Sequence, residues 1–285
     1  MIKMKKTRKN LLIFIATLLL SVASIFAQNG TTGQLIWSIS DGTLTISPIS
    51  EEGAMLDYHS SENQAPWRAF SNSFTTVIIE NGVTNIGQYA FCNCINLISV
   101  IIGNSVTTID FRAFTGCGLT GTLTIPSSVT IIGDDAFADC SNITSIEVNT
   151  NNPNYSSNDG ILYNKLQDSL IKCPEGKTGA VSIPNSVTTI ESFAFGLCKG
   201  LTSVTIPNSV TTIGFRAFYD CTGLTNLLLE DGTTTLSELS VYTFENCPIE
   251  NLYFGRNISY EDYYSPFYNK TTLTTLIIGN SMQQA

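Results

Sequence analysis

Histidine is almost absent from this sequence, which has His59 as its single copy among 285 residues. A serine, histidine and aspartate triad needs a histidine as general base, and His59 stands in a stretch that has the character of a surface loop. Glycine-rich phosphate loops and clusters of metal-ligand residues are also missing. The sequence therefore predicts no enzyme, no cofactor and no metal site.

Basic residues are scarce as well, with 14 Lys and Arg against 23 Asp and Glu. Five of the 14 lie in the first nine residues, so removing the start of the chain leaves nine basic residues against 23 acidic ones, a net charge near −14. Such a surface repels nucleic acid and anionic lipid, and we expect no nucleic acid partner. Charged residues make up only 13% of the chain. The polar surface must therefore consist of Ser, Thr and Asn, which suit hydrogen bonding to proteins or sugars, although short turns need the same residues.

A long apolar run occurs at the start of the chain, from Leu11 to Ala27, after five basic residues. This order, with a small residue before Gln28, predicts a secretory signal peptide at residues 1–27. The alternative is an uncleaved membrane anchor, because the run reaches the lower length limit for a span. No cysteine precedes Cys92, which excludes lipid attachment to a new N-terminal cysteine. We expect a secreted or cell-surface protein without membrane insertion after cleavage.

A unit of the form Ala-Phe-x-x-Cys recurs along the chain. Its cysteines at 94, 117 and 140, and again at 198 and 221, lie 23 positions apart, and Cys247 ends a variant unit that has Thr in place of Ala. A fixed period of this length is typical of a solenoid, in which each coil buries its apolar face against the next. The phenylalanines of the unit are Phe91, Phe114, Phe137, Phe195, Phe218 and Phe244.

Each coil is expected to hold a strand, a turn, a second short strand, another turn and one short helical turn. In the copy from 201 to 223, Val204 and Ile206 share one strand face and Pro207 ends the strand. We therefore predict an α/β solenoid of about nine 23-residue coils with short parallel strands. The inward strand residues are Val77, Val100, Leu123, Ile146, Val181, Val204, Leu227, Leu252 and Leu276.

One coil is longer than the others, since 35 positions separate Ile146 from Val181, and it lacks the Ala-Phe-x-x-Cys unit. It contains an Asn-rich loop, 149–159, followed by two strand-like runs at 160–164 and 169–173. We interpret it as a hairpin, inserted at about 149–180, that folds onto the side of the solenoid. The loop offers oxygens to a calcium ion only weakly, because calcium loops use several carboxylates and Asp159 is its only one.

The runs Ile-Pro-Asn-Ser-Val-Thr-Thr-Ile at 183–190 and 206–213, the Ala-Phe-x-x-Cys units and the insert at 151–165 resemble the BspA-like leucine-rich repeat proteins. The resemblance covers roughly residues 70–285, and residues 41–47 and 65–67 look like the cap that precedes the repeats in that family. It implies a leucine-rich repeat solenoid at 70–285, an N-terminal β cap at 28–69, and a bacterial or protist cell-surface protein that attaches to host or microbial molecules. It brings no catalytic residue set.

Eight cysteines in a secreted chain would ordinarily suggest disulfides. Six of them share one repeat position, so stacking places them in one buried column, and we predict free thiols there that act as small apolar side chains. Cys92 and Cys173 stand outside this column, and we expect a solvent-facing thiol or a pair from them. The Cys92-x-Cys94 spacing does not fit a zinc knuckle.

The outward positions of the first strands are mostly polar in the middle of the chain and apolar toward both ends. Apolar residues without a structural need favour contact surfaces, and Tyr253 with Leu228 is the preferred patch. Cover by neighbouring coils or by a further domain is the alternative. A tyrosine-rich segment at 260–268 is a second candidate, although it also suits a lid over the coil. The candidate contact residues are Ile101, Leu228, Tyr253, Ile277, Tyr263 and Tyr264.

Residues 273–282 begin another repeat that stops before its Ala-Phe-x-x-Cys unit, so we expect an end that is uncapped or truncated. We predict an adhesin-like, non-catalytic module that binds an extracellular protein, such as a matrix or plasma protein. The alternatives are a glycan-binding accessory protein, in which tyrosines stack on sugar rings, and a structural surface component that self-associates through the open end.

Overall fold

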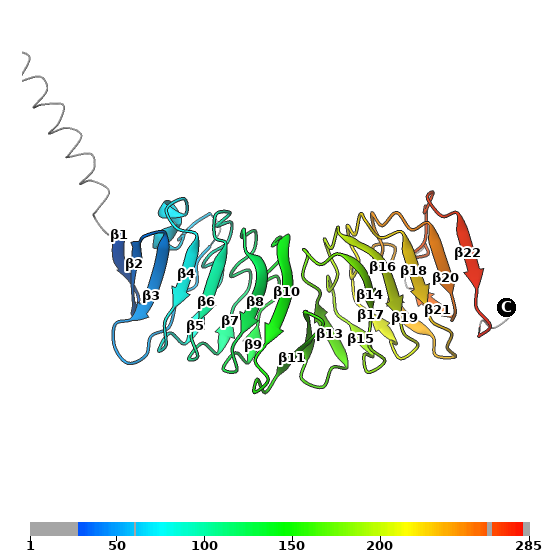
Figure 1. Cartoon of the computed structure of the whole chain (residues 1–285), viewed down its shortest axis with the longest axis horizontal. Coiled ribbons are helices and arrows are strands. Elements are labelled where there is room, and N and C mark those ends of the chain that lie inside the picture. The colour runs from blue at the N-terminus through cyan, green and yellow to red at the C-terminus, as the bar shows by residue number, and fades with distance from the viewer. Residues whose placement is uncertain (1–27, 60, 261–263, 282–285) are drawn as a thin grey trace, which may run out of the picture.

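The computed structural model describes residues 28–59, 61–260 and 264–281 and shows one elongated stack of coils (Figure 1). The predicted signal peptide at 1–27 and the candidate residue Tyr263 lie outside the described residues. Short strands make up nearly all regular structure, and the described part of the chain has a single helix, the 3-10 helix η1 (Pro66–Phe70). Within those same residues, no helix has the length and apolarity needed to cross a membrane.

Three antiparallel strands come before the coils: β1 (Gln28–Thr32), β2 (Leu35–Ser40) and β3 (Thr43–Pro48). Strand β3 then pairs in parallel with β4 (Thr76–Ile79), placing Leu44 beside Val77. The first coil thus has a paired neighbour instead of an open strand edge. Trp67 of η1 is fully buried against this coil, and its Nε1 donates to the carbonyl oxygen of Ala90 at 2.9 Å. The limits of the cap, 28–69, stay a prediction.

One face of the stack consists of parallel strands, one from each coil. Inward residues pair in register, as Val77 does with Val100 and Val204 with Leu227, and β16 ends at Ile206, directly before the proline. The prediction of about nine coils is confirmed. The strands are β4, β6 (Ser99–Ile102), β8 (Thr120–Ile125), β10 (Asn142–Val148), β14 (Gly179–Ser182), β16 (Leu201–Ile206), β18 (Asn226–Leu229), β20 (Asn251–Phe254) and β22 (Thr275–Ile278).

A second row of shorter strands runs along another face of the coils. Thr189 pairs with Thr212 and Ile190 with Ile213, so the Thr-Ile dipeptide of the repeat stacks on itself. The strands are β5 (Asn85–Ile86), β7 (Thr108–Ile109), β9 (Ile131–Ile132), β13 (Ser169–Lys172), β15 (Thr189–Ile190), β17 (Thr212–Ile213), β19 (Leu236–Leu239) and β21 (Ile258–Tyr260).

The inserted segment adds antiparallel strands to this second row. The two predicted runs form β12 (Ile161–Asn164) and β13, which pair as a hairpin. The Asn-rich loop supplies a further strand, β11 (Tyr155–Asn158), on the outer side of β12. The insert is therefore three-stranded, and β13 joins it to the parallel row by pairing with β15.

The third side of each coil is a run of hydrogen-bonded turns where we expected a short helical turn. Arg216 has φ +52° and Asp220 has φ +57°, and such left-handed residues stop a helix from forming. Every second amide donates instead to the next coil. The Phe114 amide bonds the carbonyl oxygen of Ala136 at 2.8 Å, and the Phe195 amide bonds that of Ala217 at 2.7 Å. The turns thus form their own ladder between coils.

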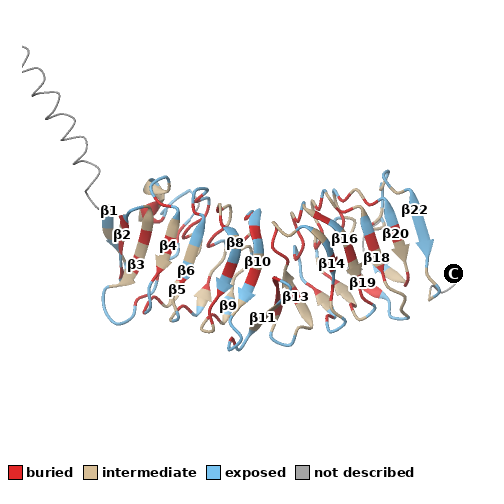
Figure 2. Ribbon diagram, in the orientation of Figure 1, coloured by how far each residue is buried: buried red, intermediate tan, exposed pale blue. Residues whose placement is uncertain are grey.

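Phenylalanine rings stack along the core beneath these turns. Ring centroids lie 5.0 Å apart for Phe91 and Phe114, 4.7 Å apart for Phe195 and Phe218, and the planes are nearly parallel. Buried residues run through the strands along the stack (Figure 2). They form two clusters, one from Leu35 to Leu162 and the other from Ile161 to Leu252. The two clusters meet in the sequence at β12 of the insert.

All eight cysteines are unpaired and buried, which confirms the predicted free thiols. The thiol of Cys117 donates to the carbonyl oxygen of Phe91 at 3.1 Å, and Cys221 does the same to Phe195 at 3.0 Å. The expectation of a solvent-facing thiol or a pair from Cys92 and Cys173 is wrong. The Cys173 amide bonds the Ala194 carbonyl oxygen at 2.7 Å, as a phenylalanine does in a regular coil. Arg68 of η1 donates to the Cys92 carbonyl oxygen and lies next to that residue.

Strand β22 is the last one described, and its four residues are exposed. Leu276 pairs in register with the buried Leu252 yet is 54% exposed, because the described residues include no further coil beyond it.

Candidate interaction surfaces

The outward side of the first strand row carries three of the candidate contact residues side by side. Leu228 pairs in register with Tyr253, and Tyr253 with Ile277, on neighbouring strands β18, β20 and β22. Ile277 is 52% exposed, whereas the other two are half-buried. We call these three residues the apolar row. They interrupt a strand face whose neighbouring outward residue, Thr205, is polar.

Tyr253 is held in place within the apolar row by a hydrogen bond. Its hydroxyl donates to Oδ2 of Asp231 at 2.6 Å, and this bond to the carboxylate is the main cause that raises the pKa of Tyr253. A fixed aromatic ring loses little rotamer freedom when a partner covers it.

The remaining candidates lie elsewhere. Ile101 is 55% exposed on β6, near the other end of the stack, where it pairs with Ile78. Tyr264 lies in the turn segment between β21 and β22, and its ring is 4.2 Å from that of Tyr268. Phe267 of the same segment stacks on Phe244 at 5.3 Å and extends the core column. The structure therefore joins Leu228, Tyr253 and Ile277 but separates Ile101 from them.

The Asn-rich loop of the insert is built for packing. Asn152 is fully buried, its Nδ2 donates to the carbonyl oxygens of Pro126 and Val129 at 2.8 Å each, and its Oδ1 accepts from two amides of its own loop. Asp159, the one carboxylate considered for calcium, pairs with Lys177 at 3.1 Å. Among the residues that the structure describes, no group of three His, Cys, Asp or Glu side chains is placed to hold a metal.

A cleft of about 850 Å³ opens where the insert meets the turn side of the stack. The cleft arises because one connection within the long inserted coil is shorter than its counterpart in the next coil. Leu170 pairs with Ile190, and Val181 with Val204, but 11 positions separate Leu170 from Val181 whereas 14 separate Ile190 from Val204. The short connection pairs with the next coil, as the Cys173 amide does with the Ala194 carbonyl oxygen, and the turn segment 134–138 of the preceding coil forms a wall of the cleft.

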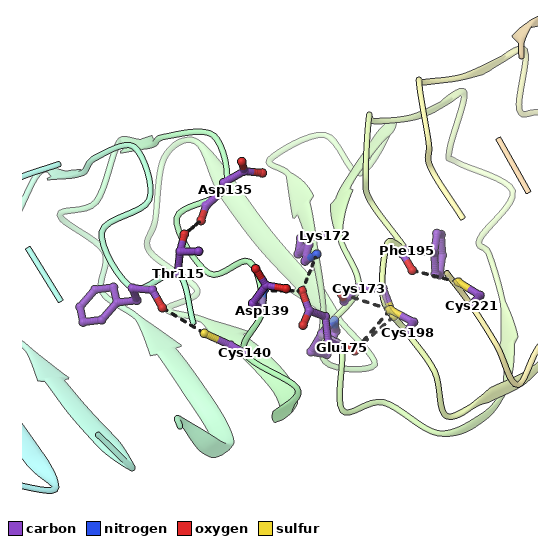
Figure 3. A network of polar contacts seen from close by, with 12 residues as sticks. Thr115, Asp135, Asp139, Cys140, Lys172, Cys173, Glu175, Phe195, Cys198 and Cys221 are labelled. Atoms are coloured by element: carbon purple, nitrogen blue, oxygen red, sulfur yellow. Dashed lines mark hydrogen bonds and ion pairs between the residues drawn. The ribbon is translucent and has the colours of Figure 1, made fainter. Parts of the chain in front are cut away.

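An ion pair between the partly buried Lys172 and the buried Glu175 lies beside this cleft (Figure 3). Lys172 Nζ is 3.3 Å from Oε1 of Glu175, and the same oxygen accepts the Asp139 amide at 3.0 Å. The Glu175 carboxylate thus replaces the carbonyl oxygen that a regular coil would offer. Burial raises the pKa of Glu175, and the neighbouring Lys172 opposes this shift. Sequence reasoning missed the cleft, although the missing Ala-Phe-x-x-Cys unit was its signal.

Comparison with known protein families identifies the repeat. A family model described as the BspA type leucine rich repeat region matches residues 67–175 and 175–285, with six copies. A search of curated proteins finds no match.

Three solved structures illustrate the likeness. The pneumococcal vaccine antigen PcpA has a TM-score of 0.62 at 17% identity, over 89% of this chain and 82% of that one. A leucine rich cell surface protein from Faecalibacterium prausnitzii has a TM-score of 0.49 at 23% identity, over 89% and 95%. A leucine-rich repeat protein from Eubacterium ventriosum has a TM-score of 0.45 at 21% identity, over 90% and 95%. The likeness to PcpA concerns the fold alone, while the family model spans most of the sequence, and the chain therefore belongs to the BspA-type leucine-rich repeat family.

Proposed function

We propose that this chain is a secreted or cell-surface module that binds an extracellular protein without catalysing a reaction. The observation that carries the proposal is the apolar row of Leu228, Tyr253 and Ile277, which lies beside the polar outward residues Ser203 and Thr205 of strand β16. Aromatic and aliphatic side chains grouped on an exposed sheet are typical of contact sites between proteins. The family membership supports the same reading, and one similar structure is a leucine rich cell surface protein.

The test is binding of the purified chain to an array of extracellular-matrix proteins, plasma proteins and glycans. A Leu228→Ser, Tyr253→Ser double variant is compared with an Ile95→Ser variant, which also removes an exposed apolar side chain, 70% accessible, outside the row. We expect a protein hit that the double variant weakens by roughly tenfold or more and the control leaves within about twofold.

Other outcomes would redirect the proposal. A hit on glycans alone would favour the exposed pair Tyr264 and Tyr268 as a stacking surface for sugar rings, since the two rings lie 4.2 Å apart. Polymerisation that rises with concentration, without any hit on the array, would favour a structural surface component.

A further inference from the structure

The cleft beside the insert is a place where one step of the turn ladder is missing. In regular coils, alternate amides of the turn segment donate to the next coil, as Arg112 does to the carbonyl oxygen of Asp134 at 3.1 Å and Phe114 does to that of Ala136 at 2.8 Å. The equivalent amides one coil later belong to Asp135 and Phe137, and both residues line the cleft. Within the described residues these two amides have no hydrogen-bond acceptor.

The opposite wall of the cleft has a backbone carbonyl oxygen without a hydrogen-bond donor. In a regular coil the Phe193 amide donates to the carbonyl oxygen of Phe215 at 3.1 Å. The equivalent acceptor one coil earlier is the carbonyl oxygen of Ser192, which also lines the cleft and accepts no hydrogen bond from any residue described. These two donors and this acceptor are the backbone groups that a regular neighbouring coil would pair, so an added segment of polypeptide that reaches both walls satisfies them. Unpaired backbone groups gain free energy when a strand is added beside them.

The charges of the walls favour a basic occupant. Asp135 is neutralised by Arg112, whose Nη2 is 2.9 Å from its Oδ2, and Lys172 is paired with Glu175. Asp134 and Glu191 have no cationic partner in the part of the chain that the structure describes. Both are exposed on the rim of the cleft.

The aromatic residues of the cleft walls also favour an occupant with a basic side chain. The guanidinium of Arg112 lies 5.0 Å from the ring centre of Phe111, and that of Arg216 lies 5.2 Å from that of Phe215. Phe193, which packs edge-on against Phe215 at 5.9 Å, is 37% exposed and has no cation over its ring among the described residues. A basic side chain entering the cleft would repeat at Phe193 the stacking that the chain uses at Phe111 and Phe215.

We propose that this cleft binds an extended segment of a partner protein that carries a basic side chain. Its backbone carbonyl oxygens accept from the amides of Asp135 and Phe137, its own amide donates to Ser192, and its basic group lies between Phe193 and the carboxylates of Asp134 and Glu191. This inference rests on the proposed function of protein binding but uses a surface separate from the apolar row.

The test begins with a phage-displayed library of random peptides of roughly eight residues, long enough to span the cleft in an extended form. The library is selected on the purified chain, and the enriched peptides are synthesised. We expect them to contain Arg or Lys, and we expect binding to protect the Asp135 and Phe137 amides from hydrogen exchange measured by NMR.

Matched variants locate the site. Asp134→Asn with Glu191→Gln removes two charges from the cleft, and Glu147→Gln with Glu250→Gln removes two exposed charges elsewhere, so both proteins have the same net charge. We expect a loss of affinity of roughly tenfold or more in the first and a change within about twofold in the second. Ser192→Trp, at an exposed position of the wall, is expected to block binding by filling the cleft.

Several results would overturn the inference. They are the absence of any enriched peptide, enrichment without basic residues, equal losses in the two charge variants, and binding of glycans instead of peptides in the cleft. The inference would also be overturned if the Leu228→Ser, Tyr253→Ser variant lost peptide binding while the cleft variants kept it. That result would leave the proposed protein binding by the apolar row intact.

Discussion

At the scale of single residues, the stack depends on phenylalanine and cysteine at two fixed repeat positions, three residues apart. Phe218 is fully buried between Phe195 and Phe244, with ring centroids at 4.7 and 5.1 Å. The thiol of Cys247 donates to the Phe218 carbonyl oxygen at 3.0 Å. Each coil with the Phe-x-x-Cys unit thus contributes one ring and one thiol. The thiols of Cys117, Cys140, Cys221 and Cys247 each donate a second hydrogen bond to a phenylalanine carbonyl oxygen of the preceding coil, which already accepts a backbone amide.

Replacing Phe218 by Ala should lower the free energy of unfolding by about 3–5 kcal/mol, because the cavity lies between two stacked rings. Urea denaturation followed by circular dichroism measures the change. Phe193→Ala removes a ring of the same size that is 37% exposed, and it should cost less than about 1 kcal/mol. Equal losses for the two variants would contradict the role of the buried column.

The buried thiols should be unreactive and should make stability fall in alkaline solution. Burial raises the pKa of Cys140 to about 12 and that of Cys94 to about 11, against 9.0 for an unperturbed thiol. The unfolded chain therefore loses these protons at lower pH than the folded chain, so the stabilisation is complete below pH 9 and declines as pH rises through the folded pKa values.

Two measurements check this. A colorimetric thiol reagent at pH 8 should modify the native chain only at the rate of unfolding, and urea midpoints should fall from about pH 9 upward. Rapid modification of native thiols would show that the column is accessible and would refute the account.

At the scale of structural elements, the insert connects two halves of the stack through few side chains. Asn152 makes four hydrogen bonds that join its loop to the preceding coil and to itself. Strand β12 supplies Leu162 to one core cluster and Ile161 to the other. The insert thus replaces the missing Ala-Phe-x-x-Cys unit as the contact between the two clusters.

Asn152→Ala should lower the free energy of unfolding by roughly 2–4 kcal/mol, because the carbonyl oxygens of Pro126 and Val129 lose their buried donor. Asn151→Ala, at the exposed neighbouring position, is the control and should change stability by less than about 1 kcal/mol. Chemical denaturation gives both values, and limited proteolysis should show faster cleavage within 149–159 for the first variant alone. If Asn152→Ala leaves the free energy of unfolding unchanged, other contacts hold the loop and the account of Asn152 is wrong.

The sequence alone was sufficient for the period, the nine coils and the buried cysteine column, because one residue type recurs at one position. It was insufficient for the turn side, since the left-handed conformations of Arg112, Phe193 and Leu197 follow from stacking and run against the preference of those residues. The cleft also escaped prediction, because its cause is the pairing of Leu170 with Ile190, which only the structure shows.

At the scale of the whole molecule, the stack has two core clusters and two separate candidate surfaces. The apolar row lies on strands β18, β20 and β22, and the cleft lies on the turn side beside the insert. In a solenoid each coil contacts only its neighbours, so a local change is transmitted weakly along the stack. The two surfaces can therefore be altered one at a time.

A destabilising substitution in one core cluster should speed hydrogen exchange in that cluster and not in the other. Phe218→Ala is expected to speed amide hydrogen exchange in the coils from Cys173 to Leu252 and to leave those from Leu35 to Ile146 within error, because the former belong to its own cluster. Exchange followed by mass spectrometry resolves the two regions. A uniform increase along the chain would show one cooperative core.

The central claim, that this solenoid binds an extracellular protein through the apolar row, is tested most directly by photocrosslinking. A benzoylphenylalanine is placed at Leu228, or at Ile95 as the control, and each chain is irradiated with the protein hit from the array. The account predicts an adduct from position 228 and none from position 95. Adducts of equal yield from both positions, or from position 95 alone, would contradict it.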